Sequence, residues 1–263
     1  MTLEVLVCTF DGGIDKVADV LLPPMADVRY LISFQYSDDS YKHRLSSLQF
    51  NRKDVRVISV RGRGLSANRN HAVANAVGDI LLLADDDVRY KEIYFRRILE
   101  CFITNPQLDI ACFQAETLDG NPFKPYAATS FSYSNQPHGT WFSSVEIAFR
   151  RKAACPRFDE RFGLGAPFLC AGEEEVFLLQ AFRNGLDIHY YPEVVVRTES
   201  HTTGRRFFAS PAMQRTKGAV LCLIHGPFGA WIRCLKFSLR HIRQSNPLRT
   251  LYEMTRGILY VKP

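Results

Sequence analysis

Three consecutive carboxylates follow a run of apolar residues in the segment "LLLADDDVRY", residues 81–90. Asp85, Asp86 and Asp87 repel one another, so they stabilise a fold only when positive charge lies among them. Carboxylate oxygens are hard ligands that suit Mg²⁺ or Mn²⁺, and Mg²⁺ is usually held by one or two carboxylates together with substrate phosphates. The run therefore indicates a metal or nucleotide site, with a solvated turn at the end of a strand as the alternative.

A second acidic group begins the segment "EEEVFLLQAFRNG", residues 173–185. Its apolar residues have helical spacing and Gly185 provides a stop signal, which predicts a helix. Glu173, Glu174 and Glu175 then occupy the first turn, where acids also complement the helix dipole without any catalytic role. One carboxylate cluster for a metal ion and another to take a proton from a hydroxyl would equip the chain for transfer from a diphosphate.

The elements that must position these acids alternate along the first 115 residues. Strands are predicted at residues 3–10, 28–34, 54–60, 79–84 and 108–116. Helices are predicted at residues 11–22, 64–78 and 92–104. This alternation predicts an α/β fold with a doubly wound parallel sheet. The strands are continuously apolar, as expected when both faces are covered.

In such sheets ligands bind outside the carboxyl ends of the strands. Polar loops follow three of the predicted strands at that edge: Thr9–Asp11 after the first, Ser37–Asp39 after the second and Asp85–Asp87 after the fourth. We expect the three loops to converge, which favours a ligand site over a solvated turn.

Composition places the chain among globular proteins, since 46% of its 263 residues are hydrophobic and 23% are charged. The seven cysteines include no CxxC pair, which argues for reduced thiols in a cytoplasmic protein and against a structural zinc site. The first residues form a strand pattern and not a signal peptide. The longest apolar stretch, residues 219–232, is too short for a spanning helix and contains Pro227.

The net charge of +6 is unevenly distributed. From Arg205 onward eleven basic residues and one acid give +10, whereas residues 1–204 carry −4. Within the segment 229–243 two groups of residues fall on opposite sides of a predicted helix. The first is apolar (Trp231, Ile232, Leu235, Leu239 and Ile242) and the second is basic (Arg233, Lys236, Arg240 and Arg243). Such a helix packs its apolar side on the protein or lies on an anionic membrane surface.

Several motifs, in this order, resemble the inverting GT-A-type glycosyltransferases of family 2. They are "CTF" after the first strand, "GLSANRNHAVANAVGDILLLADDD", "FDERFG" and "GEEEVFLLQAFRNGLDIHYYPE", within about residues 3–201. The resemblance implies a GT-A-like, mostly parallel sheet with a small antiparallel part, followed by the basic helical tail. Residues 1–115 would bind the nucleotide sugar, residues 116–204 the acceptor, and residues 205–263 would form the tail.

The resemblance implies roles for individual residues. Asp87 would contact the metal ion, Mn²⁺ or Mg²⁺, with His201 completing the metal or diphosphate site. Glu174 stands where the family usually has its catalytic Asp; because the motif here is Glu-Glu, Glu173 or Glu175 could carry the role instead. The implied donor-binding residues are Thr9, Asp11, Asp38 or Asp39, Arg69, Asp85, Asp86 and Arg205.

The implied reaction is inverting transfer from a nucleotide-diphosphate sugar, of UDP type, to a glycan acceptor that could be lipid-linked. Nucleic acid is not an expected partner. The protein would be cytoplasmic, or peripheral at the inner face of the membrane if the tail binds lipid.

Other classes fit the residues less well. A nucleotidyltransferase would show a better phosphate loop than "CTFDGGIDK", and a Rossmann oxidoreductase would place GxGxxG after the first strand. A catalytically idle sugar-nucleotide-binding subunit is the non-enzymatic alternative, although intact Asp85, Asp87 and Glu174 argue against it. Aromatic residues of the loop 116–142, such as Trp141 and Phe142, could stack on a sugar or pack the core.

Overall fold

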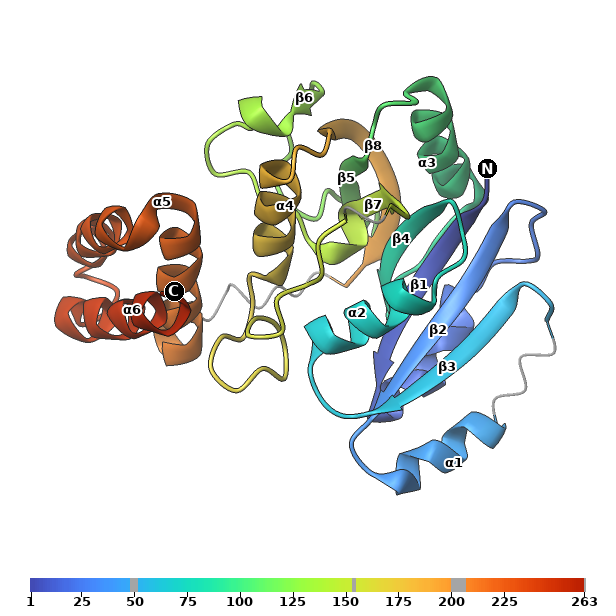
Figure 1. Ribbon diagram of the computed structural model, residues 1–263, viewed down its shortest axis with the longest axis horizontal. Coiled ribbons are helices and arrows are strands. Elements are labelled where there is room, and N and C mark those ends of the chain that lie inside the picture. The colour runs from blue at the N-terminus through green and yellow to red at the C-terminus, as the bar shows by residue number, and fades with distance from the viewer. Residues whose placement is uncertain (48–51, 153–154, 200–206, 263) are drawn as a thin grey trace. The chain divides into compact units, whose positions relative to one another are not determined.

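The computed structural model describes residues 1–47, 52–152, 155–199 and 207–262 (Figure 1). The chain forms two compact units. The first consists of residues 1–63, 67–157 and 180–200, and the second of residues 64–66, 158–179 and 201–263. Residues 158–179 group with the C-terminal helices in the second unit.

The first unit is built on one eight-stranded sheet of order β3-β2-β1-β4-β7-β5-β8-β6. The strands are β1 Leu3–Phe10, β2 Val28–Tyr36, β3 Val55–Arg61, β4 Ile80–Asp85, β5 Ile110–Thr117, β6 Phe131–Ser132, β7 Ile147–Arg150 and β8 Ile188–Thr198. Strands β3, β2, β1 and β4 pair in parallel, as do β5 and β8. Strand β7 is antiparallel to β4 and β5, and β6 is antiparallel to β8. The prediction of a mostly parallel sheet with an antiparallel part is confirmed.

The helical segments that precede β8 are η1 Asp11–Val20, α1 Asp39–Ser47, α2 Leu65–Asn75, α3 Glu92–Thr104, η2 Tyr133–Asn135, η3 Ser144–Glu146 and α4 Glu173–Arg183. The helices predicted at residues 11–22, 64–78 and 92–104 are present as η1, α2 and α3, whereas α1, η2 and η3 were not predicted. The segment after β1 is a 3₁₀ helix, with Ile14, Val17 and Val20 as its buried residues. Their spacing of three matches the three residues per turn of that helix type.

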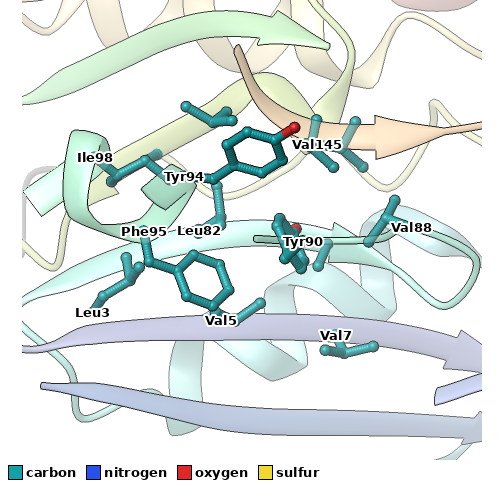
Figure 2. Packing of buried hydrophobic residues seen from close by; sticks show 14 of the residues in the cluster. Leu3, Val5, Val7, Leu82, Val88, Tyr90, Tyr94, Phe95, Ile98 and Val145 are labelled. Atoms are coloured by element: carbon teal, nitrogen blue, oxygen red, sulfur yellow. The ribbon is translucent and has the colours of Figure 1, made fainter. Parts of the chain in front are cut away.

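The core of the first unit lies where α3 packs on the sheet. Figure 2 shows Phe95 and Tyr90 near Leu3, Val5 and Leu82, which come from strands β1 and β4. The rings of Tyr90 and Phe95 are 4.9 Å apart. All residues of β4 except Asp85 are buried, so the strand is held on both faces and only its acidic end reaches the surface.

The second unit contains α5 Pro211–Arg240 and α6 Pro247–Val261. The two helices touch through glycines: a Cβ on Gly218 would lie 2.0 Å from the Met254 carbonyl oxygen, and a Cβ on Gly257 would lie 1.9 Å from that of Arg215. Any larger residue would separate the helices. The core around this contact includes Phe162, Leu169, Val176, Ala219 and Ile258.

Helix α5 is longer than the apolar stretch 219–232 predicted, and by length and composition alone it could cross a membrane. Gly226 interrupts it, however, with φ 71° and ψ 168°, immediately before Pro227. The break leaves segments at residues 211–225 and 227–240, each shorter than the roughly 20 residues that a spanning helix needs. Gly226 suits this break because its backbone conformation is costly for other residues.

Candidate active site

The acids at the end of β4 are joined to β1 through Thr9. The two strands are parallel neighbours, with Cys8 paired to Asp85, so the residues that follow lie side by side. The buried Thr9 donates a 2.6 Å hydrogen bond from Oγ1 to Oδ2 of Asp86. Burial raises the pKa of Asp86, and the hydrogen bond from Thr9 opposes that shift. The middle acid is therefore held within the protein.

Gly13, in the first turn after β1, leaves space for this pair. A Cβ on Gly13 would lie 2.1 Å from Oδ2 of Asp86 and 2.8 Å from Oγ1 of Thr9. Glycine is thus required here by close approach. Gly13 was not predicted as a site residue, because nothing in the "DGG" triplet indicates which glycine faces the acid.

Asp11 connects the loops that follow β1 and β2. Its carboxylate accepts hydrogen bonds from the Ser37 amide, at 2.8 Å, and from the Ser37 hydroxyl, at 2.7 Å. Its φ of 47° lies in the left-handed region, which Asp tolerates better than most residues. The prediction that these loops converge is met between β1 and β2, with Asp11 as the link.

The two candidates for the base contact, Asp38 and Asp39, have different surroundings. Oδ1 of Asp38 accepts a 2.8 Å hydrogen bond from the Ser40 amide in the first turn of α1, which lowers the pKa of Asp38. Asp39 is exposed and lies 3.7 Å from Nη1 of Arg61. Asp38 therefore caps a helix, whereas Asp39 is paired with Arg61, and both acids are exposed.

Arg69 supplies the positive charge that the acidic cluster requires. It is only 2% exposed, its Nη2 donates a 2.7 Å hydrogen bond to Ser144 Oγ, and the same atom lies 3.5 Å from Oδ1 of Asp85. A buried guanidinium stays charged and offsets part of the repulsion among the acids. Arg69 was predicted to border the nucleotide. In the structure it is buried and faces the Asp85 carboxylate from within the protein.

Asn68 is a positioning residue that the sequence analysis missed. It is 2% exposed, and its Nδ2 donates to the carbonyl oxygens of Thr9, at 3.0 Å, and Ser33, at 3.1 Å. Its Oδ1 accepts a 2.6 Å hydrogen bond from Ser33 Oγ. Asn68 thus fixes β1, β2 and α2 to one another directly beneath the loops. The available signal was the repeated Asn in "SANRNH", where apolar residues would be expected on a helix that packs on a sheet.

Asp87 differs from its two neighbours. Within the described part of the chain it forms no hydrogen bond or ion pair, and it is only half-buried. No group of three or more His, Cys, Asp or Glu residues suited to a metal ion occurs among the described residues. One or two carboxylates at an open strand end fit an ion such as Mg²⁺ or Mn²⁺ that takes further ligands from phosphates. His201 and Arg205 lie outside the described residues.

The second acidic cluster belongs to the second unit, at the start of α4. The predicted helix is confirmed at Glu173–Arg183. Glu173 is buried, Glu174 is half-buried and Glu175 is exposed, so the three acids of this first turn have different access to solvent. Gly172, at φ 85°, sets the approach to the helix, since a Cβ there would lie 2.9 Å from Val220 Cγ2.

The loop after β5 is anchored at Glu146, which is fully buried. Glu146 accepts hydrogen bonds from Lys124 Nζ, at 2.5 Å, and from the hydroxyl of Tyr126. Lys124 also lies 3.7 Å from the ring centroid of Trp141. Of the two aromatic residues considered for sugar stacking, Phe142 is buried at 4% exposure, and Trp141 remains 39% exposed.

Residues 14–158, more than half of the chain, match the sequence model described as Glycosyl transferase family 2. No curated protein matches the chain in sequence. Among solved structures, S. aureus TarS 1-349 is similar with a TM-score of 0.61 and 13% identity, over 98% of this chain and 90% of that one. TarS 1-349 in complex with UDP-GlcNAc gives a TM-score of 0.60 and 15% identity, over 93% and 74%.

A longer TarS structure gives a TM-score of 0.59 and 15% identity over 94% of this chain, which spans only 44% of that protein. At such identities the similarity is one of fold, and it agrees with the sheet order and the GT-A-like architecture described above. The family match covers β2 to β7, including the acids of β4. The chain belongs to glycosyl transferase family 2.

Proposed function

We propose that this chain is an inverting glycosyltransferase that moves a sugar from a UDP-type nucleotide sugar to a glycan hydroxyl with the help of Mn²⁺ or Mg²⁺. The observation that carries the proposal is the different surroundings of the three acids after β4. Asp85 faces the Arg69 guanidinium and Asp86 is fixed by Thr9, while Asp87 is half-buried beside them. The family and the fold shared with a protein solved with UDP-GlcNAc support the donor class.

On the donor side, the chain's own residues hold the nucleotide in place. Asp11 and Ser37 fix the loops expected to contact the base, and Asp38 and Asp39 are exposed acids of the second loop. Asp87 would hold the divalent ion, which when bound supplies Lewis-acid stabilisation of the diphosphate, and Asp85 would bind the donor nucleotide. Because the Arg69 guanidinium offsets the negative charge of Asp85, the site accepts an anionic diphosphate and a cation together.

On the acceptor side, Glu174 takes the proton from the attacking hydroxyl. A new bond forms between that oxygen and the anomeric carbon as the bond from this carbon to the diphosphate oxygen breaks. One direct displacement inverts the anomeric configuration. The first turn of α4 suits the carboxylate because the helix dipole stabilises negative charge there, and Glu174 is the acid of that turn with intermediate exposure.

The experiment is a turnover assay with a panel of UDP-sugars and glycan acceptors, with Mn²⁺ or with a chelator. We expect UDP release that requires the metal and an acceptor, and NMR of the product should show an inverted anomeric centre. Metal-dependent UDP binding without any turnover would instead assign the chain as an idle binding subunit. Absence of both binding and turnover would refute the proposed function.

A further inference from the structure

The part of α5 beyond the Gly226 break, residues 227–240, packs through three small residues and the partly buried Phe237. Ala230 and Cys234 are 0% exposed and Ser238 is 1% exposed. Ala230 and Cys234 belong to the core of the second unit. Of the large apolar residues of this segment, Phe237 packs against that core, whereas Trp231 and Leu239 are exposed, contrary to the packed alternative considered for the tail.

These large apolar residues form an exposed stripe instead. Phe228 is 78% exposed, Trp231 43% and Leu239 57%, while Leu235 between them is half-buried. Ile242, in the turn that follows, is 59% exposed. Spacings of three and four residues keep the four members within α5 in an arc of about 80°, at ~100° per residue. We call Phe228, Trp231, Leu235, Leu239 and Ile242 the apolar stripe.

A basic face borders the apolar stripe. Arg233, Lys236, Arg240 and Arg243 are exposed, and the same helical geometry centres them about 120° from the stripe. The sole acid in the sequence from residue 207 to 262 is Glu253. It is 8% exposed and accepts a 2.9 Å hydrogen bond from Arg215. The exposed surface contributed by these residues therefore carries cations and no exposed carboxylate.

We infer that the apolar stripe inserts into the interfacial region of an anionic membrane, with the basic face contacting lipid headgroups. A short helix with an apolar sector, aromatic residues and flanking cations lies in the plane of such an interface. A second copy packed symmetrically through this same surface would bring one basic face against another, with no exposed acid between residues 207 and 262 to neutralise it. Anionic lipid supplies the missing charge.

The chain offers a residue-specific probe of this inference, since Trp141 and Trp231 are its two tryptophans. Trp141→Phe leaves Trp231 as the reporter within the stripe. We expect this protein to sediment with vesicles of phosphatidylcholine and phosphatidylglycerol, with a blue shift of Trp231 emission. Vesicles of phosphatidylcholine alone should bind at least tenfold less. Raising NaCl to about 500 mM should also weaken binding, because salt screens the headgroup attraction.

Variants separate the stripe from the rest of the surface. Phe228→Ser combined with Leu239→Ser should lower vesicle binding at least tenfold, whereas Ile103→Ser, at a 59% exposed site on α3, should not change it. Circular dichroism checks that each variant is folded. If the double variant is not folded, the Trp231 emission shift in Trp141→Phe still tests the inference. Failure to bind anionic vesicles at low salt, or binding without a Trp231 shift, overturns the inference. A lipid-free dimer that the double variant abolishes would overturn it too, by assigning the stripe to a second copy. None of these measurements depends on sugar transfer.

Discussion

Thr9 and Asp86, 77 positions apart in the sequence, are joined by a 2.6 Å hydrogen bond at the ends of neighbouring strands. The bond holds the middle acid of the cluster, so that Asp85 and Asp87 project from a fixed strand end. Arg69, itself held by Ser144, lies behind Asp85. The acidic cluster is therefore organised by the protein before any ligand binds, which is what rapid electrostatic catalysis requires.

Gly13→Ala tests this organisation. Its Cβ would lie 2.1 Å from Asp86 Oδ2, so we expect the acid to move and the affinity for UDP with Mn²⁺ to fall at least tenfold. Displacements of about 1 Å can lower activity by about 10²-fold. The matched control is Gly12→Ala, where the nearest atom is Arg44 Nη1 at 3.8 Å. Calorimetric titration gives both affinities, and equal values would show that Asp86 need not be fixed.

Asp87→Asn tests the metal role. We expect the variant to lose the Mn²⁺-dependent part of its UDP affinity, because an amide is a weaker ligand than a carboxylate for a hard cation. A chelator should have the same effect on the parent protein. Asp19→Asn is a suitable control, since Asp19 is exposed and ion-paired with Arg89 at 2.8 Å. Metal-dependent binding of unchanged strength in Asp87→Asn would exclude this residue as a ligand.

Glu174→Gln tests the general base. We expect UDP binding close to that of the parent and a turnover lower by about 10²-fold or more, the usual effect of removing a general base. Glu173→Gln and Glu175→Gln are compared in the same assay, because these acids differ in exposure within one turn. Full turnover in Glu174→Gln, together with loss in either neighbour, would move the assignment by one residue.

The sheet and α4 could be predicted because their signals are local. The apolar run ending at Asp85 is β4, and the spacing before Gly185 is α4. Partners distant in sequence could not be predicted: nothing near Asp86 indicates Thr9. The tail illustrates the same limit. Helical spacing located its apolar side correctly, but which side packs depended on contacts around Cys234 that spacing does not encode.

Lys124→Met tests the anchor of the loop after β5. Lys124 and Glu146 have side chains only 8% and 0% exposed, so removing the cation leaves a buried carboxylate with fewer donors. We expect a loss of about 3 kcal/mol in the free energy of unfolding. Lys91→Met, at a half-exposed pair with Glu116 separated by 4.0 Å, should cost less than about 1 kcal/mol. Glu146 also accepts hydrogen bonds from the Ser143 amide, at 2.6 Å, and the Ser143 hydroxyl, at 2.9 Å. Urea denaturation measures both variants, and similar small losses would mean that Tyr126 and Ser143 suffice to satisfy Glu146.

The last prediction concerns His71, which contacts the Ser33 hydroxyl of strand β2. The Ser33 hydroxyl donates to Asn68 Oδ1, so it accepts from His71 Nδ1, 3.0 Å away, which assigns the neutral tautomer with hydrogen on Nδ1. Burial lowers the pKa of His71. The unfolded chain, with a His pKa of about 6.5, then binds more protons than the folded protein between the two values.

Stability should therefore be fully present above pH ~6.5 and should decrease as the pH falls toward the lowered pKa of His71, levelling off below it. His71→Asn keeps an N–H donor in the position of Nδ1 but cannot titrate. We expect its unfolding free energy, measured with urea from neutral to mildly acidic pH, to decrease less than that of the parent. Parallel curves for the two proteins would show that another group causes the acid sensitivity. Removing His71 must remove its share of the proton uptake on unfolding. A steeper decrease of the unfolding free energy in His71→Asn would therefore contradict the direction of the pKa shift.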